Sequence, residues 1–121
     1  MRAAIERWSA EWQNGGDRIA FAARDPHTLV LMGGCELRRD GGHAQLSYWT
    51  FPPYRRRGVA AAALRLVCDF AATELGVATF EARVDPANLA SRRVAEKAGF
   101  VAQGTMHEDS GAERVRYLHR V

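Results

Sequence analysis

The spacing of hydrophobic residues alternates between two periods along this chain, and it predicts both strands and helices. Apolar residues at every second position, or in a short continuous run, are typical of strands, whereas apolar residues three and four positions apart are typical of helices. Strands are expected at residues 18–24, 28–39, 43–51, 77–84, 100–106 and 115–121. Helices are expected at residues 3–13, 59–75 and 89–98.

Glycine and proline mark the ends of these elements. Gly76 follows the second helix, where a left-handed residue commonly ends a helix. Asp40-Gly41-Gly42 has the composition of a hairpin turn, and Pro52-Pro53 ends the preceding strand because proline offers no N–H to a ladder. Within the strand at 28–39, Gly33-Gly34 indicates a bulge or the close approach of another group.

The order of elements predicts an α/β (α+β) fold. Its sheet is expected to be mixed and largely antiparallel, with helices on both faces and one central β-α-β crossover through residues 59–75. A chain of 121 residues is long enough for one core, so we expect a single domain over residues 1–121. Ligands of such sheets favour the crevice where neighbouring strands change direction.

Composition narrows the class of protein. No apolar run approaches the ~18 residues of a membrane helix, and the N-terminus lacks the apolar core of a signal peptide. Cys35 and Cys68 have no spacing that relates them to each other or to a histidine, which indicates two reduced, buried thiols in a cytoplasmic protein. The histidines have no metal-ligand spacing, so no metal site is expected.

The net charge of +3 comes from arginine, because Lys97 is the single lysine. Arginines cluster at residues 38–39, 55–57 and 92–93, which suits a polyanionic ligand. The excess is too small for a nucleic-acid-binding signature, and the aromatic residues follow core-like periods instead of interleaving with a basic face.

The arginine turn at residues 55–57 stands directly before Gly58 and the predicted helix at 59–75. The first N–H groups of a helix lack internal partners, and the helix dipole adds partial positive charge there. A phosphate or pyrophosphate suits this site. The turn is neither a P-loop nor a Gly-x-Gly-x-x-Gly fingerprint. A solvated basic turn at the start of a core helix is the alternative.

Two motifs in this frame resemble the GNAT superfamily of acetyl-CoA-dependent N-acetyltransferases. Arg55-Arg56-Arg57-Gly58-Val59-Ala60 matches the family's Arg/Gln-x-x-Gly-x-Gly/Ala pyrophosphate loop. The segment from Asn88 to Phe100 resembles the Asn-x-x-Ser…Glu-Lys-x-Gly-Phe segment of the ribosomal-protein-alanine (Rim-type) branch, which Tyr48-Trp49 also fits. The resemblance covers about residues 18–121.

The resemblance implies acetyl-CoA as co-substrate and a role for each matched position. Backbone N–H groups of residues 56–61 are expected to hold the pyrophosphate, and the strand at 49–51 to bind the pantetheine arm and point an N–H at the thioester carbonyl. Asn88 binds the arm from the far side. The expected cofactor-binding residues are Trp49, Thr50, Phe51, Arg55, Arg56, Arg57, Gly58, Val59, Ala60, Ala61, Asn88, Ser91 and Arg93.

Proton transfer is assigned by the same resemblance. Many relatives carry a tyrosine acid where this chain has Ala95, whereas in the Rim-type branch the serine of Asn-x-x-Ser takes this role, here Ser91. Asn88 and Ser91 are equally explained as a helix cap. For the base, Glu108 is the expected residue, with His107 beside it and Glu36 as alternatives.

The N-terminal end differs from the Rim-type pattern. That branch has a strand and a helix before the region where this chain begins, and they build one wall of the acceptor site. The chain is therefore expected to be N-terminally short, and a second subunit, as in a homodimer, can supply the wall through an exposed strand edge.

The predicted function is acetyl-CoA-dependent transfer of an acetyl group to a primary amine, of a protein N-terminus or a small molecule, by direct attack. A domain that binds acetyl-CoA with little or no activity is the alternative. The expected partner is the amine acceptor, without nucleic acid or membrane.

Overall fold

The computed structural model describes residues 4–11 and 17–121, the first of these segments by its backbone alone. Its strands are β1 (Ala4–Glu11), β2 (Arg18–Arg24), β3 (Leu31–Asp40), β4 (His43–Thr50), β5 (Thr79–Val84), β6 (Val101–His107) and β7 (Glu113–Arg120). Its helices are α1 (Val59–Leu75) and α2 (Leu89–Lys97), with a 3-10 turn η2 (Pro52–Tyr54) before α1.

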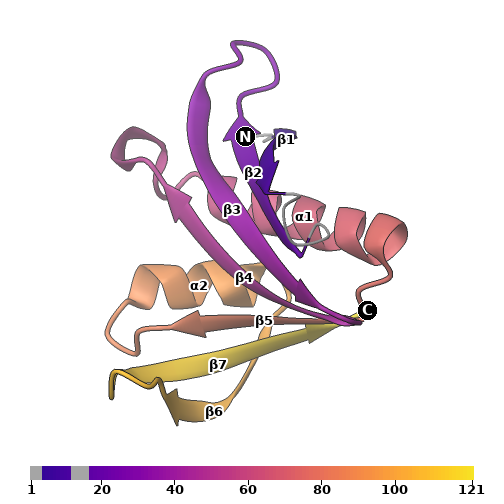
Figure 1. The fold of residues 1–121 in the computed structure, drawn as a ribbon. Coiled ribbons are helices and arrows are strands. Elements are labelled where there is room, and N and C mark those ends of the chain that lie inside the picture. The colour runs from indigo at the N-terminus through magenta and orange to yellow at the C-terminus, as the bar shows by residue number, and fades with distance from the viewer. Residues whose placement is uncertain (1–3, 12–16) are drawn as a thin grey trace.

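One seven-stranded sheet organises the described residues, in the order β1-β2-β3-β4-β5-β7-β6 (Figure 1). Among the strands that the structure describes, only β4 and β5 are paired in parallel, and α1 makes the crossover between them. The other pairs are antiparallel, with Asp40 opposite His43 across the two-residue turn Gly41-Gly42. The predicted α/β fold with one β-α-β crossover is confirmed.

Both ends of α1 are set by glycine. Gly58 before the helix has φ 75° and Gly76 after it has φ 67°, so each adopts the left-handed conformation that other residues adopt only with strain. Between them, the buried side chains of Val59, Leu64 and Val67 face the sheet. The predicted bounds of this helix are therefore those of the structure.

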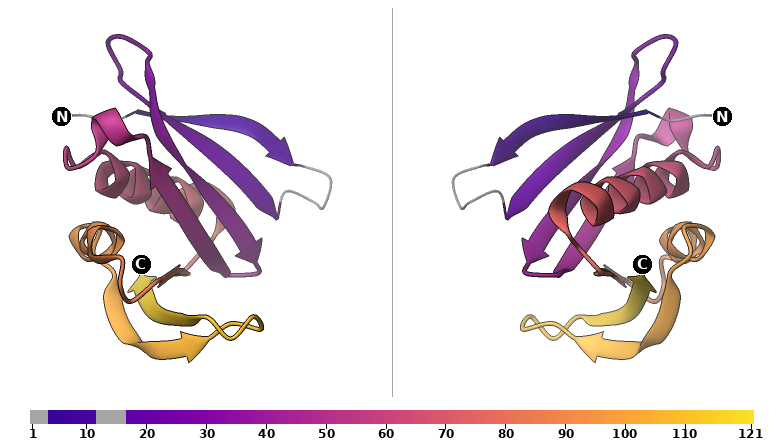
Figure 2. Two further views of the ribbon diagram at one scale, coloured as in Figure 1. Left: turned by 90° about the vertical axis from the view of Figure 1, so that its left-hand side faces the viewer. Right: turned by 90° about the vertical axis from the view of Figure 1, so that its right-hand side faces the viewer.

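The apolar core lies on the face of the sheet that α1 and α2 cover. Phe80 and Ala82 of β5 pack there in one cluster with Leu64 of α1 and Ala95 of α2. Successive right-handed crossovers in the same direction along a sheet bring both helices to one face. Figure 2 shows α1 and α2 on the same side, so the helices of the described residues lie on one face and not on both as expected.

The other face of the sheet is polar. Glu81 of β5 is 2% exposed and accepts hydrogen bonds from Arg83 of the same strand and Arg116 of β7. Glu36 of β3 pairs with Arg18 and Arg38. Ion pairs, instead of an apolar layer, thus stabilise this face among the described residues.

The predicted helix at residues 3–13 is wrong, because Ala4–Glu11 form the edge strand β1. The strand pairs antiparallel with β2, with Ile5 opposite Ala23 and Arg7 opposite Phe21. The period that indicated a helix is local, whereas the partner that decides for a strand comes from another segment of the chain.

Gly33 and Gly34 are required where β3 meets the end of β4. A Cβ at Gly33 would collide with the Trp49 carbonyl oxygen, and one at Gly34 with the Trp49 ring. The pairing of β2 with β3 also shifts register at Ala23, opposite Gly33. Both the bulge and the close approach predicted for this pair are confirmed.

The two thiols are buried and free, as expected. Burial raises the pKa of Cys68 to about 12 and raises that of Cys35 further, so neither thiol is reactive. No helix in the described part of the chain is long and apolar enough to span a membrane.

Candidate functional site

The parallel strands β4 and β5 separate halfway along their length. Their pairing runs from His43 opposite Thr79 to Leu46 opposite Ala82 and ends there. Beyond this point the two strands diverge, with α2 behind them (Figure 1). We call the space between residues 47–50 of β4 and residues 83–84 of β5 the split. The split lies at the end of the parallel pair, where β4 and β5 stop bonding to each other. Ligands of open α/β sheets favour a crevice of this kind.

Backbone groups of β4 face the split. Hydrogen-bonded and non-hydrogen-bonded pairs alternate in an antiparallel ladder. The Phe51 N–H donates to the Met32 carbonyl at 2.9 Å, so the next pair, Thr50 with Gly33, belongs to the type that does not exchange bonds. The N–H of Thr50 therefore points away from β3 and towards the split.

Phe51 was expected to bind a ligand through its backbone, and in the structure both of its backbone groups have partners within the chain. Its N–H bonds Met32, and its carbonyl accepts from the Tyr54 N–H at 2.9 Å. The side chain is 39% exposed. Trp49, also in the predicted set, places its ring over Gly34 on the polar face of the sheet.

The predicted anion site forms a tight turn between η2 and α1. Arg56 has φ 64° and Gly58 has φ 75°, both left-handed. For Arg56, a non-glycine residue, this conformation costs about 1 kcal/mol. The Ala62 N–H donates to the Gly58 carbonyl at 3.0 Å, which is the first bond of the helix. The N–H groups of residues 59–61 precede it and have no partner within the helix.

The arginines of this turn differ in their contacts. Arg55 donates from Nε to the Thr50 carbonyl at 3.0 Å, which ties the turn to the end of β4. The Arg57 guanidinium lies over the Tyr54 ring, 5.9 Å from its centroid. All three arginines are exposed. They bring positive charge to the segment directly before these N–H groups, while Arg55 and Arg57 also fix the shape of the turn.

The first turn of α2 closes the other side of the split. Asn88 is its N-cap and accepts from the Ser91 N–H through Oδ1 at 3.0 Å. The capping explanation of the Asn88–Ser91 spacing is thus confirmed for the Asn88 oxygen, and the amide NH₂ of Asn88 is left as a donor. Arg93, two residues on, is exposed.

Tyr48 was not among the predicted site residues, yet it contacts one of them. Its hydroxyl donates to the Ser91 carbonyl at 2.8 Å and accepts from Ser91 Oγ at 3.1 Å. Burial raises the pKa of Tyr48 above its ordinary value, so the hydroxyl keeps its proton at neutral pH. The two residues are 43 positions apart in the chain, so no local sequence pattern predicts their contact.

The candidate bases lie in two places. Glu108 follows β6 and is held by Arg114, whose Nε donates to Glu108 Oε1 at 3.1 Å. His107 ends β6 and is exposed. Glu36 lies on the polar face of the sheet between Arg18 and Arg38, 3.5 and 3.9 Å away. The structure thus separates Glu36 from the β6–β7 turn that carries the other two.

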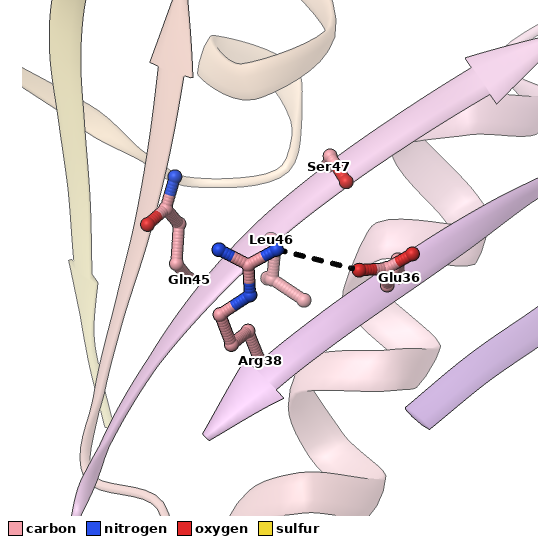
Figure 3. Close-up of a pocket in the computed structure, with 5 residues that line it drawn as sticks. All are labelled: Glu36, Arg38, Gln45, Leu46 and Ser47. Atoms are coloured by element: carbon pink, nitrogen blue, oxygen red, sulfur yellow. Dashed lines mark ion pairs between the residues drawn. The ribbon is translucent and has the colours of Figure 1, made fainter. Parts of the chain in front are cut away.

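A small hollow on the polar face lies beside the split. It measures about 60 Å³ and is lined by Glu36, Arg38, Gln45, Leu46 and Ser47. Figure 3 shows the Arg38 side chain extended towards Glu36 across it. Ligand pockets measure roughly 300–1,000 Å³. The hollow is too small for such a ligand, though its Ser47 end adjoins the split.

Three comparisons bear on this geometry. The family model described as "Acetyltransferase (GNAT) domain" matches residues 1–101. The "Probable N-acetyltransferase YjcK" of Bacillus subtilis (strain 168) is 37% identical over 78 residues, which are 64% of this chain and 43% of that protein. The chain thus spans less than half the length of this relative.

Solved structures share the fold at lower identity. The ribosomal-protein-S5-alanine acetyltransferase from Vibrio fischeri superposes with a TM-score of 0.77 at 18% identity, covering 91% of this chain and 65% of that one. The aminoglycoside acetyltransferase AAC(6')-Ib in complex with coenzyme A and kanamycin gives 0.75 at 19% identity, covering 86% and 67%. The family match extends over most of the sequence, from the first strand to the start of β6. The chain belongs to the GNAT family of acetyltransferase domains.

Proposed function

We propose that this chain is an acetyl-CoA-dependent N-acetyltransferase domain that moves an acetyl group to a primary amine. The observation that carries the proposal is the split between β4 and β5, which has the N–H of Thr50 directed into it and is followed along the chain by the free N-terminus of α1. This combination provides an anion site at one end and a directed N–H at the other.

The residues of the turn fit the pyrophosphate of acetyl-CoA. The N–H groups of residues 59–61 have no partner in α1, and the helix dipole favours negative charge there. Arg56, directly before this helix, is held in a strained left-handed conformation. Because strain of this kind persists where the surroundings demand it, it supports a binding role for the turn.

The split fits the pantetheine arm. The arm is an extended chain of amides and takes hydrogen bonds as a strand would. Tyr48 and Thr50 offer backbone groups on the β4 side, and the Asn88 amide offers a donor on the α2 side. Bound acetyl-CoA supplies an activated acetyl thioester.

Within that arrangement, Thr50 is the residue assigned to the thioester carbonyl. Its N–H is fixed by the ladder and needs no reorganisation to stabilise an oxyanion. The amine nitrogen attacks the carbonyl carbon, a C–N bond forms, and the C–S bond breaks. The amine loses one proton and the departing thiolate gains one.

Glu108 is assigned as the base that accepts the proton of the amine. Ser91 is assigned as the acid: its hydroxyl hydrogen-bonds to the thiolate and passes it a proton, which water restores to the serine. Arg114 fixes the Glu108 carboxylate at the end of β6, so the group is preorganised. Ser91 lies at the first turn of α2, beside the split.

The acceptor is a primary amine of a protein N-terminus or a small molecule. The Vibrio fischeri neighbour is named for a ribosomal-protein alanine, and AAC(6')-Ib was solved with kanamycin. The buried free thiols suit the reducing cytoplasm. The edge strand β1 is open to pairing with a second copy, which sedimentation would detect as a dimer.

Calorimetric titration with acetyl-CoA tests the proposal, with desulfo-CoA and ATP as controls. Micromolar binding that ATP does not match is expected, followed by release of CoA with a panel of primary amines. Binding without turnover on any amine would favour a domain that binds acetyl-CoA without activity. If acetyl-CoA does not bind at all, the proposal is wrong.

A further inference from the structure

A pair of hydroxyl groups bridges the split from β4 to α2. Tyr48 lies in the half of β4 that has left β5, and its hydroxyl reaches the Ser91 carbonyl at 2.8 Å and Ser91 Oγ at 3.1 Å. Both residues are half-buried. The two hydroxyls therefore lie on the side of the split that faces α2.

Ser91 is fixed from two sides. Its N–H is held by Asn88 Oδ1 at 3.0 Å, and its carbonyl and hydroxyl are held by Tyr48. Tyr48 in turn is aligned opposite Cys35 of β3, whose side chain is buried in the core. The serine hydroxyl is therefore positioned by groups from two separate elements, which a cap alone does not require.

The bridge contains two protons and three acceptors. Ser91 Oγ–H donates to Tyr48 Oη, and Tyr48 Oη–H donates to the Ser91 carbonyl. When an anion lies beside Ser91, the serine proton can turn towards the anion while Tyr48 turns to donate to Ser91 Oγ. Hydrogen bonds in such a chain strengthen one another, and a bond to a charged acceptor is stronger than a neutral one.

We propose that Tyr48 is a positioning residue that holds the Ser91 hydroxyl towards the sulfur of coenzyme A and so stabilises its thiolate. This inference rests on the proposed function, because the sulfur reaches Ser91 only if the pantetheine arm lies in the split. Ser91 contacts the sulfur, and Tyr48 acts through Ser91.

A purely structural role for Tyr48 would be to attach α2 to the sheet. A second tyrosine already does this: the Tyr117 hydroxyl of β7 donates to Glu96 Oε2 at 2.9 Å and accepts from Arg92 Nε at 3.1 Å. Tyr117→Phe removes a sheet-to-α2 hydroxyl without contact to Ser91. It is the matched control for Tyr48→Phe.

The test follows the ultraviolet absorbance of the thiolate of bound CoA as the pH is raised. In Tyr48→Phe and in Ser91→Ala, the ratio of thiolate to thiol at a fixed pH is expected to fall about tenfold relative to the wild type. The double variant is expected to match Ser91→Ala, because Tyr48 acts through the serine. Tyr117→Phe is expected to match the wild type.

The possible outcomes separate this inference from the proposed function. If the wild type does not bind CoA, the proposed function itself fails. If CoA binds and Ser91→Ala alone changes the ratio, Tyr48 has no positioning role. If neither variant changes it, or if Tyr117→Phe changes it as much as Tyr48→Phe, the inference is wrong while the cofactor site stands.

Discussion

The two ends of the split are built from different kinds of group. At the α1 end, the proposed binding features are the N–H groups of residues 59–61 and the left-handed turn at Arg56 and Gly58. For the reaction itself, the proposed features are side chains, and each has a neighbour: Ser91 at the start of α2 has Tyr48, and Glu108 in the β6–β7 turn has Arg114.

This difference determines how each end responds to substitution. A backbone site is insensitive to most side-chain changes and fails when the chain can no longer approach its ligand. A side-chain site fails one group at a time, and each loss leaves a partner unsatisfied. A single substitution at the α1 end should therefore abolish anion binding there completely. Substitutions of the reactive side chains should instead lower activity one group at a time.

The largest effect is expected from Gly58→Arg. A side chain at this position stands where the pyrophosphate is proposed to approach the N-terminus of α1, and acetyl-CoA affinity should fall by more than about a hundredfold, near 3 kcal/mol. The added Cβ meets no atom within 4 Å, so the fold should persist with a strain of about 1 kcal/mol at φ 75°. Calorimetry and far-ultraviolet circular dichroism measure the two quantities.

Gly41→Arg is the matched control for this variant. Gly41 also has a positive φ, 61°, with open space around its Cβ, but it lies in the β3–β4 hairpin turn. It should show similar strain and wild-type affinity. Unchanged affinity in Gly58→Arg, or an equal loss in both variants, would remove the assignment of the turn.

At the reactive end, Glu108→Gln is expected to lower kcat by about a hundredfold without changing acetyl-CoA affinity, because a base acts on the amine and not on the cofactor. Glu113→Gln in the same hairpin is the control, since the Glu113 side chain is exposed and Arg114 contacts only its carbonyl. Steady-state kinetics with calorimetry separate the two effects. Equal rates for both variants would exclude Glu108 as the base.

The smallest effect is expected from a substitution of Glu81. This residue lies in β5, the strand that connects α1 to α2. Glu81→Gln should reduce the free energy of unfolding by about 2 kcal/mol, because Arg83 and Arg116 lose their common carboxylate partner. Both ends should then lose ligand binding at the same, lower temperature. If ligand binding were lost at one end only, the two ends would not depend on the same strand for their stability.

The pH dependence of this stability follows from the sign of the pKa change. Burial would raise the pKa of Glu81, but the hydrogen bonds from Arg116 and Arg83 outweigh it and lower that pKa below 4.5. The stabilisation is therefore present above pH 4.5 and is lost as the pH falls through the folded-state pKa. Urea unfolding should show the wild type and Glu81→Gln converging below this pH; a constant difference down to pH 3 would contradict the assignment.

Much of the fold could be predicted from the sequence because its signals are local. Gly58 and Gly76 mark α1, and the alternation in β5 correctly separates Phe80 and Ala82 from Glu81. The error at residues 4–11 arose because Ile5 and its neighbours have a helical period, whereas pairing with β2 is a contact with another segment.

The same distinction applies to the site. The turn at residues 55–58 is a continuous stretch, so its residue types and order were sufficient to predict a turn before α1, and its role as an anion site stays a prediction. The Tyr48–Ser91 bridge and the Glu81–Arg116 pair join residues that are 43 and 35 positions apart in the chain. The sequence around each of these residues gives no sign of the contact. The direction of the Phe51 N–H, which bonds Met32, depends on the β3–β4 register and could not be predicted from the local sequence.

The pair Gly33-Gly34 has a consequence for how this chain can vary. Since a Cβ at Gly33 would collide with the Trp49 carbonyl, any larger residue there must push the end of β4 away from β3 and towards β5. The width of the split is thus controlled from a strand that does not line it. In a library of random substitutions, these two glycines should be as intolerant as the residues that touch the ligand.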